Sequence, residues 1–278
     1  MRILLARIWQ WPTGRLGLMC VALILLVALL APVIAPYGPN AIDVKNRLQG
    51  PSFTHWLGTD HLGRDLLSRV MDGTRVAVLV SIAVIAIAAT IGLLLGMIAA
   101  LAPRRIERIV LVIFDIISAF PSTILALALI ALFGTGVANL VLLVSLAFVP
   151  QFGRIARAQT LAIRNAPFIE AERVLGASHG RIVLSHVLPN ILGPVFVLAS
   201  MNIPVVITIE AGLSFLGIGV PPPLASWGSM LRDGYTYLNQ SVWPTIGAAG
   251  ALTLATLGST LFGEALRDAT DPKLQGVS

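Results

Sequence analysis

The stretch VAVLVSIAVIAIAATIGLLLGMIAALA, residues 76–102, decides the fold class because it carries no charged residue from end to end. A helix needs about 20 apolar residues to cross the hydrocarbon core of a bilayer. The chain as a whole is 56% hydrophobic and only 12% charged over 278 residues, whereas soluble domains carry about 25% charged residues. A soluble fold would expose too much apolar surface, so most of this chain has to lie in lipid.

Outward from this run, five further apolar segments predict an all-α membrane protein with six transmembrane helices. Two of them are free of charge, one is interrupted by Asp115, one reaches Arg154 and Arg157 near the interface, and one holds several prolines. The expected spans are 16–34, 76–102, 109–133, 137–158, 187–209 and 242–262. Residues 1–15 and 269–278 then form the two ends, residues 35–75 form an outer segment, and residues 76–268 form a five-span core.

The first apolar run could also be a signal peptide, because Val33-Ile34-Ala35 resembles a cleavage site. Pro36 follows directly and disfavours cleavage, and the run is long for the apolar region of a signal peptide. An uncleaved first span is therefore the preferred interpretation.

The basic residues predict the orientation of these spans. With both ends in the cytoplasm, the inner segments hold about twice as many lysines and arginines as the outer ones, as the positive-inside rule requires. Arg69 and Arg75 lie on the outer side near the second span and count against this assignment. The net charge of +6 would suit nucleic-acid binding in a soluble protein, but here the charges flank apolar runs. Cys20 is the only cysteine, so an intramolecular disulfide is excluded.

A charged, helix-forming insert lies between two predicted spans at residues 165–190, NAPFIEAERVLGASHGRIVLSHVLPN. Asn165 is a candidate N-cap, Pro167 suits a first helical turn and Gly176 suits the C′ position. Apolar side chains recur at helical spacing on one side of this helix, at Phe168, Ala171, Val174 and Leu175. The pattern predicts a short cytoplasmic helix in a loop over 165–186. Its apolar stripe either fits a groove on a partner or lies on the membrane surface.

Several polar or helix-breaking residues lie inside the predicted spans. Asp115 either forms an ion pair with a nearby arginine, Arg108, Arg154 or Arg157, or serves a proton relay; the pair is the favoured interpretation. Glu210 lies near the outer end of the fifth span, where helix-end packing is favoured over gating. Prolines free backbone carbonyls, which are tolerated against protein or water, so the third and fifth spans are expected to line a pathway. The structural or gating candidates are Asp115, Pro121, Pro189, Pro204 and Glu210, with Pro194 as a further break.

Gly92 and Gly96, continued by Ala100, form a row of small residues in the second span. Such rows allow two helices to approach closely in a membrane. Chance occurrence is common in glycine-rich membrane chains, so tight packing and coincidence both stay open.

Catalytic and metal chemistry find little support in the sequence. No GxxxxGK[ST] motif occurs, so nucleotide binding by that route is excluded. His179 and His186 fall in the inner loop without a convincing nucleophile beside them. The outer segment holds possible metal ligands, but turn chemistry around its two glycines explains them more simply; they are His55, Asp60, His61 and Asp65. We therefore expect no catalytic residue, no metal site and no cofactor bound by this chain.

The run EAERVLGASHGRIVLSHVLPN resembles the EAA loop of ABC importer permeases, with a departure at Glu172, where the family usually has alanine. The matching positions are Glu170, Ala171, Gly176, Ile182, Leu188 and Pro189. Other motifs are similar to those of the dipeptide/oligopeptide/nickel permease family, of the DppC/OppC type. They are His55 to Asp60 with Leu62-Gly63-Arg64-Asp65 and Ser68-Arg69, Phe120-Pro121-Ser122, Glu210-Ala211 with Leu213 to Gly217, Ser226-Trp227-Gly228 with Met230-Leu231, and Leu266-Arg267-Asp268 with Asp271-Pro272.

This resemblance implies the type I ABC importer permease fold, N-in/C-in, in the inner (plasma) membrane of a prokaryote. It implies a non-catalytic subunit that pairs with a second homologous permease and works with two ABC ATPase subunits, which bind ATP and Mg, and with an extracytoplasmic substrate-binding protein. A cytoplasmic coupling helix would sit in an ATPase cleft through Phe168, Glu170, Ala171, Glu172, Leu175 and Gly176. The implied substrates are di- or oligopeptides, with nickel chelates, glutathione or oligosaccharides as alternatives.

Two rival functions belong to other classes of protein. A proton-coupled secondary transporter would use Asp115 and would show inverted repeats, of which the sequence gives no sign. A membrane-embedded hydrolase would need a nucleophile and a base, and no convincing set is present.

Overall fold

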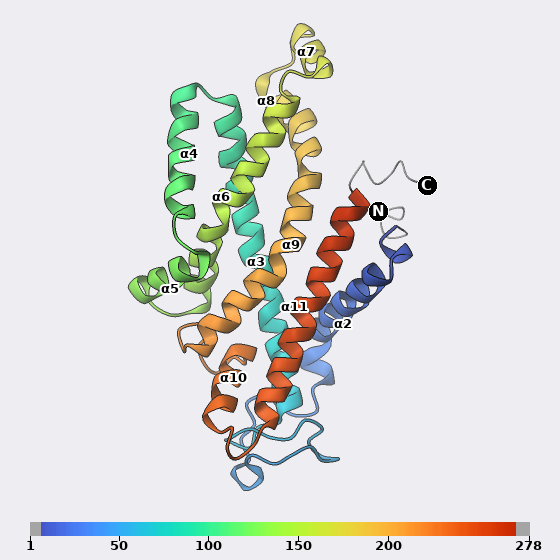
Figure 1. Ribbon diagram of the computed structural model, residues 1–278, viewed down its shortest axis with the longest axis vertical. Coiled ribbons are helices and arrows are strands. Elements are labelled where there is room, and N and C mark those ends of the chain that lie inside the picture. The colour runs from blue at the N-terminus through green and yellow to red at the C-terminus, as the bar shows by residue number, and fades with distance from the viewer. Residues whose placement is uncertain (1–6, 271–278) are drawn as a thin grey trace.

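The apolar runs become long helices that lie side by side along one axis of the molecule (Figure 1). The computed structural model describes residues 7–270, so Asp271 and Pro272 of the last motif lie outside the described residues, as do Arg2 and Lys273, two of the basic residues counted on the inner side. Five helices are long and apolar enough to cross a membrane, and a bent pair would make a sixth span. The five are α2 (Pro12–Ile34), α3 (Leu66–Leu101), α6 (Val137–Ile163), the continuous helix His179–Phe215, whose main part is α9 (Leu188–Phe215), and α11 (Trp243–Thr270).

Most of these helices run beyond the apolar segments that predicted them. Helix α3 begins at Leu66 rather than near Val76, because the carboxylate of Asp65 caps it and accepts a hydrogen bond from the Ser68 amide. Its early turns also bury Arg69, which is 4% exposed. Polar residues can form the first turns of a helix when their side chains have hydrogen-bond partners. Hydropathy alone therefore places the N-terminus of α3 too far along the chain.

The expected single helix over 109–133 is instead two helices, α4 (Arg104–Ser118) and α5 (Ser122–Phe133), which meet at 88°. Helix α4 ends where the amide of Ala119 bonds back to the carbonyls of Asp115 and Ile116. Pro121 then forms the N-cap of α5, because it lacks an amide hydrogen and disfavours helical backbone at Phe120. In Figure 1, α4 runs along the bundle and α5 turns across it.

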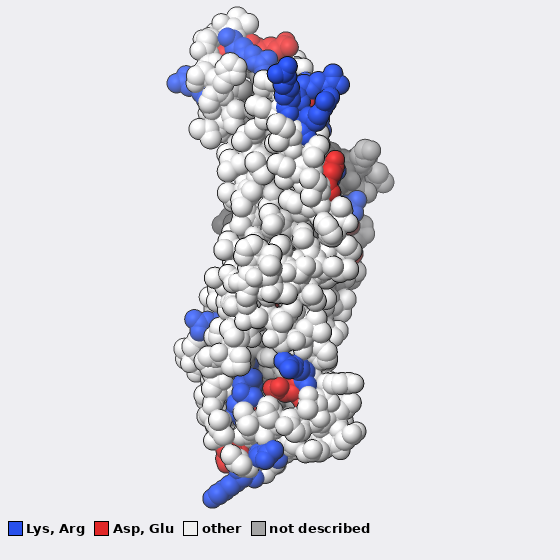
Figure 2. Space-filling model, turned by 90° about the vertical axis from the view of Figure 1, so that its left-hand side faces the viewer, with Lys and Arg blue, Asp and Glu red and all other residues white. Residues whose placement is uncertain are grey.

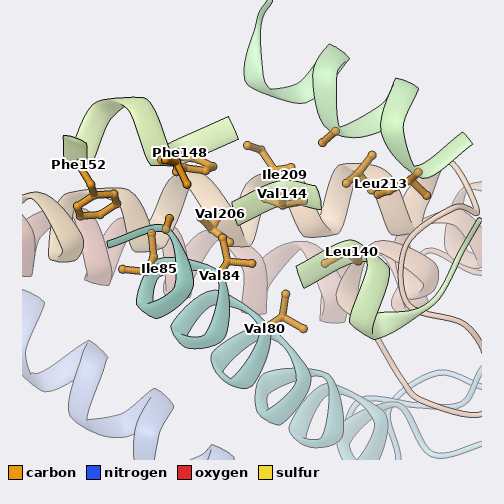
Figure 3. Packing of buried hydrophobic residues seen from close by; sticks show 14 of the residues in the cluster. Val80, Val84, Ile85, Leu140, Val144, Phe148, Phe152, Val206, Ile209 and Leu213 are labelled. Atoms are coloured by element: carbon orange, nitrogen blue, oxygen red, sulfur yellow. The ribbon is translucent and has the colours of Figure 1, made fainter. Parts of the chain in front are cut away.

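Helices α3, α6 and α9 enclose the main core (Figure 3). Phe152 is fully buried there, as are side chains from α4 and α5. The glycines of α3 lie directly against α6: a Cβ on Gly92 would stand 2.6 Å from the Cβ of Phe152, and one on Gly96 would stand 2.8 Å from the Cβ of Ala156. The row of small residues therefore does provide close helix contact, as one of its two interpretations held.

Polar structure gathers at the two ends of the bundle. One end carries α7 (Pro167–Val174), α8 (His179–Ile182) and a π-helical turn, η2 (Val183–Val187). The other carries α10 (Trp227–Thr236) and the segment that contains the 3-10 helix η1 (Val44–Asn46) (Figure 1). Figure 2 shows charged residues toward these ends and an uncharged band between them.

The first and last described parts of the chain lie together, since the Arg7 guanidinium donates to the carbonyl of Ala269 over 3.5 Å. Helices α2 and α11 bring them to the half of the bundle that carries α7 (Figure 1). An even number of crossings results, with the broken α4–α5 pair serving as one of them.

Candidate functional site

Helix α7 is the candidate docking element, and defined caps fix both of its ends. Its N-cap is Ala166 rather than Asn165, because Pro167 holds the preceding residue in extended backbone. Gly176 has φ of +83° and fills the C′ position. The amide of Gly176 donates to the Arg173 carbonyl and the amide of the next residue to the Glu172 carbonyl, each over 3.0 Å. This is a Schellman motif, in which the left-handed residue is usually glycine.

The apolar stripe of α7 faces away from the rest of the chain. Phe168, Val174 and Leu175 are 46%, 87% and 82% exposed, and Ala171 between them is exposed as well. Single exposed apolar residues are ordinary, but a contiguous stripe on one short helix marks an interaction surface. We call these four residues the docking stripe.

A residue that the sequence analysis did not single out fixes α7 to the bundle. Ile169 is fully buried and packs in a small cluster with the end of α3, α6 and the start of α9; the other buried members are Met97, Ala156, Ile182, Val187 and Ile191. The available signal was a lone apolar side chain on the polar side of an amphipathic helix. Ile169 anchors α7 to the end of the bundle, while the docking stripe stays uncovered.

Glu172, the departure from the EAA pattern, does not join the docking stripe. Its Oε1 lies 3.4 Å from Nε2 of His186 in the π-helical turn η2. The His186 ring also lies 6.4 Å from the ring of Phe168. Glu172 therefore faces back toward the loop, whereas Glu170 on the first turn is exposed.

Two arginines connect α7 and the residue range before it to the inner end of α3. The Arg164 guanidinium donates to the carbonyl of Ala100 over 2.9 Å. Arg173 of α7 in turn donates to the Arg164 carbonyl over 3.1 Å. Hydrogen bonds to charged groups are stronger than neutral ones, so these contacts couple α7 to α3 as Ile169 couples it to α9.

The charged residues of the α4–α6 pair form ion pairs with each other. Asp115 lies 2.7 Å from Arg154, and the two side chains are 65% and 48% exposed on this chain. Nearer the inner end, Arg157 donates through Nε to Glu107 over 3.1 Å. An ion pair that projects from a spanning segment faces protein or a water-filled space rather than lipid.

Glu210 is buried where α9 meets α10, and it is 2% exposed. Its Oε1 accepts hydrogen bonds from the hydroxyls of Ser214, over 2.7 Å, and Ser226, over 2.9 Å. Ser226 is the N-cap of α10, so this carboxylate joins the outer ends of two helices. Among the described residues its Oε2 has no hydrogen-bond partner.

The three prolines of the fifth span do not break it. Pro189 lies in the first turn of α9, where a missing amide costs little. Pro194 and Pro204 lie inside an unbroken helix.

The polar residues of the outer segment are engaged in turns. His55 Nδ1 lies 2.9 Å from Asp65, and Asp60 accepts hydrogen bonds from the amides of Leu62 and Arg64. The positive φ angles at the two turns, +83° and +77°, fall on Gly58 and Gly63. Across residues 7–270 no group of three or more His, Cys, Asp or Glu residues is placed to hold a metal ion.

An anchored helix with an uncovered apolar stripe lies at one end of a bundle of spanning helices, which is the arrangement expected of a membrane subunit with a partner. The chain belongs to the family described as the binding-protein-dependent transport system inner membrane component, whose profile matches residues 92–276. A second profile, the N-terminal TM domain of oligopeptide transport permease C, matches residues 4–51. The protein is therefore a non-catalytic, multi-pass permease component of an ABC transporter.

Curated relatives match over most of the chain. The dipeptide transport system permease protein DppC of Alkalihalophilus pseudofirmus is 36% identical over 259 residues, which is 93% of this chain and 85% of the relative. The probable D,D-dipeptide transport system permease protein DdpC of Escherichia coli K12 is 38% identical over 256 residues, 92% of this chain and 86% of the relative.

The fold matches a solved transporter. A chain of the MetNI methionine ABC transporter in an inward-facing conformation superposes with a TM-score of 0.58 at 19% identity, covering 74% of this chain and 97% of that one. This likeness shows the importer permease fold, and the family assignment sets aside the secondary-transporter and hydrolase alternatives.

Proposed function

We propose that the protein is the permease subunit of an ATP-driven peptide importer, and that the docking stripe of α7 sits in a cleft of an ATPase subunit. The single observation that carries this proposal is the exposure of that stripe on a helix fixed by Ile169. Without the Ile169 anchor, movement of α7 would not reach the bundle. With the stripe buried, α7 would have no apolar surface for an ATPase to bind.

The assembly follows from the family. A binding-protein-dependent component implies an ATPase and a binding protein as partners. We infer two ATPase subunits, which hold ATP and Mg, and a second, homologous permease that completes a heterodimer. The side chains of the Asp115–Arg154 pair, half exposed on this chain, would face that permease or the pathway between the two, which makes the pair structural rather than a proton relay.

The mechanism uses the two connections of α7. Closure of the ATPases on ATP would move α7, and Ile169 would carry the motion into α9. Arg164, bonded to the Ala100 carbonyl, would carry it into α3. Because packed helices shift as units rather than deforming continuously, the two helices would open the outer side of the pathway together.

The substrate class is taken from the relatives. Those compared above are named for dipeptides and D,D-dipeptides, and we assign di- or oligopeptides to this transporter. If this assignment is wrong, a substrate screen would show uptake of nickel chelates, glutathione or oligosaccharides instead of peptides.

Val174→Gln tests the docking proposal, with Val44→Gln as a matched control. Both valines are exposed, at 87% and 62%, but Val44 lies in the outer segment. Burying a valine side chain is worth about 1.5 kcal/mol or more, so Val174→Gln should weaken ATPase association about tenfold or more, while Val44→Gln should not. The measurements are ATPase co-purification and ATP-driven dialanine uptake in proteoliposomes with the binding protein supplied. Equal association and uptake in the two variants would contradict the proposal.

A further inference from the structure

A polar cavity of about 410 Å³ opens at the outer end of the bundle, on the opposite end from α7. Its wall brings together Arg64 and Arg69 at the start of α3, the 217–224 loop that follows α9, and Arg232 and Asp233 of α10. Figure 2 shows basic and acidic residues gathered around a hollow toward the lower end of the molecule. The cavity is large enough for a small organic group.

More arginines than carboxylates line this cavity. Three guanidinium groups and the carboxylate of Asp233 form its wall, the buried Asp60 lies behind it, and Asp72 acts on Arg69 from outside the wall. Arg64 Nε donates to Asp60 over 2.6 Å and its Nη2 lies 3.7 Å from Asp233. Both contacts belong to Arg64, and no carboxylate of the described residues forms an ion pair with Arg232.

Arg69 is held in place but incompletely bonded. Its Nη1 donates to the Pro39 carbonyl over 3.2 Å, and its side chain is 4% exposed. Its Nε has no hydrogen-bond partner among the described residues, and the nearest carboxylate oxygen, on Asp60, is 3.5 Å away. Its Nε is buried from solvent, so Arg69 adds positive charge to the cavity rather than a direct hydrogen bond to a ligand.

Arg232 is the exposed donor of the cavity. Within residues 7–270 its guanidinium makes no hydrogen bond or ion pair of its own, and it lies against the backbone of Gly217, where any Cβ would collide with Nη1. Gly217 has φ of +84°. The loop after α9 therefore leaves room for this guanidinium through a residue without a side chain.

We propose that the cavity binds the terminal carboxylate of the peptide as it passes from the binding protein into the permease, with Arg232 as the direct donor and Arg69 behind it. An arginine fork matches the geometry of a carboxylate. One guanidinium without an ion-pair partner, that of Arg232, suits a monovalent anion, and the neighbouring Asp233 disfavours a phosphate or other multivalent anion. This assignment rests on the proposed peptide-import function and makes the permease itself a contributor to substrate recognition.

Arg232→Gln is the test, because the side chain is exposed and its loss leaves no buried charge. Arg75→Gln is the matched control, an exposed arginine on the outer part of α3 that does not line this cavity. The complete transporter in proteoliposomes would be supplied with saturating, dialanine-loaded binding protein. We expect Arg232→Gln to lower the dialanine uptake rate about tenfold, the effect of losing one charged hydrogen bond, and Arg75→Gln to leave it unchanged. The dissociation constant of the loaded binding protein for the complex should stay the same in both.

The only cysteine of the chain allows a charge-restoration test. In a Cys20→Ser background, Arg232→Cys can be modified with a methanethiosulfonate reagent that carries either an aminoethyl or a sulfonatoethyl group. The aminoethyl group restores positive charge and should recover part of the uptake rate, whereas the sulfonatoethyl group should not. A merely structural role for Arg232 would make the two reagents equivalent.

Three results would overturn the proposal. Full uptake by Arg232→Gln would show that the cavity takes no part in transport. A weaker dissociation constant for the binding protein, in proportion to the lost uptake, would assign the cavity to an acidic patch of that protein instead. Failure of the unmodified complex to import any dialanine would refute the peptide-import function itself, and with it this assignment.

Discussion

The tight contact between α3 and α6 predicts an unusual sensitivity to a single methyl group at Gly96. An added Cβ there would stand 2.8 Å from the Cβ of Ala156 and 3.0 Å from the amide nitrogen of Arg157, and still closer to the Gly153 carbonyl oxygen. Carbon atoms in contact are normally about 3.5–4.0 Å apart. One of the two helix backbones would therefore have to shift by about 1 Å.

The cost of that shift sets the expected effect. Overpacking a close-packed site costs about 1–3 kcal/mol, against which alanine gains up to about 1 kcal/mol of helix propensity over glycine. Gly96→Ala should thus lower the free energy of unfolding by up to about 2 kcal/mol, and by about 1–3 kcal/mol relative to an alanine that meets no clash. Gly250→Ala on α11 is the control, because a Cβ there meets no other atom within 4 Å; it should be neutral or slightly stabilising.

The assay is denaturant titration of the detergent-solubilised protein, followed by tryptophan fluorescence and circular dichroism. Equal unfolding midpoints for Gly96→Ala and Gly250→Ala would refute the reasoning, since they would show that α3 and α6 adjust without cost. A loss at Gly96 that grows on substitution by leucine would strengthen it.

Three further substitutions test other contacts. Glu210→Ala should cost about 1–3 kcal/mol of stability, because it leaves the buried Ser226 hydroxyl at the start of α10 without its acceptor; unfolding titration measures this. Asp115→Asn should cost about 1 kcal/mol or less, because its ion pair with Arg154 is half exposed, and peptide uptake should keep its pH profile. Gly63→Ala should cost at least about 1–2 kcal/mol, because φ is +77° there, and thermal unfolding of the complex measures it.

The same three substitutions have outcomes that would contradict these accounts. Unchanged stability in Glu210→Ala would show that the carboxylate does not hold α10. Loss of uptake in Asp115→Asn with ATPase activity intact would support the proton-relay hypothesis over the structural ion pair. A neutral Gly63→Ala would show that the turn can rearrange away from the left-handed conformation.

The membrane spans and the short helix α7 could be predicted because their signals are local. Uncharged runs locate helices wherever water is absent, and Gly176 signals a helix end through its own backbone freedom. The break at Pro121 was missed because a proline inside a span has two outcomes: Pro204 stays within α9, whereas Pro121 starts a new helix. Whether a proline stays inside a helix or starts a new one depends on the side chains packed around it. Those side chains come from segments that are distant in the sequence.

The less predictable parts of the site depend on contacts between distant segments. Ile169 is buried only because parts of α3, α6 and α9 converge beneath α7. Arg69 was counted simply as an outer charge, yet it is buried against the Pro39 carbonyl. The outer cavity is lined by residues from around the start of α3, from α10 and from the loop after α9. No single sequence motif therefore predicts it.

Helix α3 has a consequence for how the two faces of the membrane communicate. Its 36 residues contain no proline, and at 1.5 Å per residue they make a helix about 54 Å long, well beyond the hydrocarbon thickness. The outer end of this helix carries Arg69 in the cavity wall, and the inner end receives the hydrogen bond from Arg164. A rocking of about 5° about its middle would displace the two ends by about 2 Å in opposite directions, on the scale of known helix shifts. Nucleotide binding on the inner side and substrate release on the outer side would then be coupled by opposite displacements of the two ends of α3. No relay of side chains between the two sites would be required.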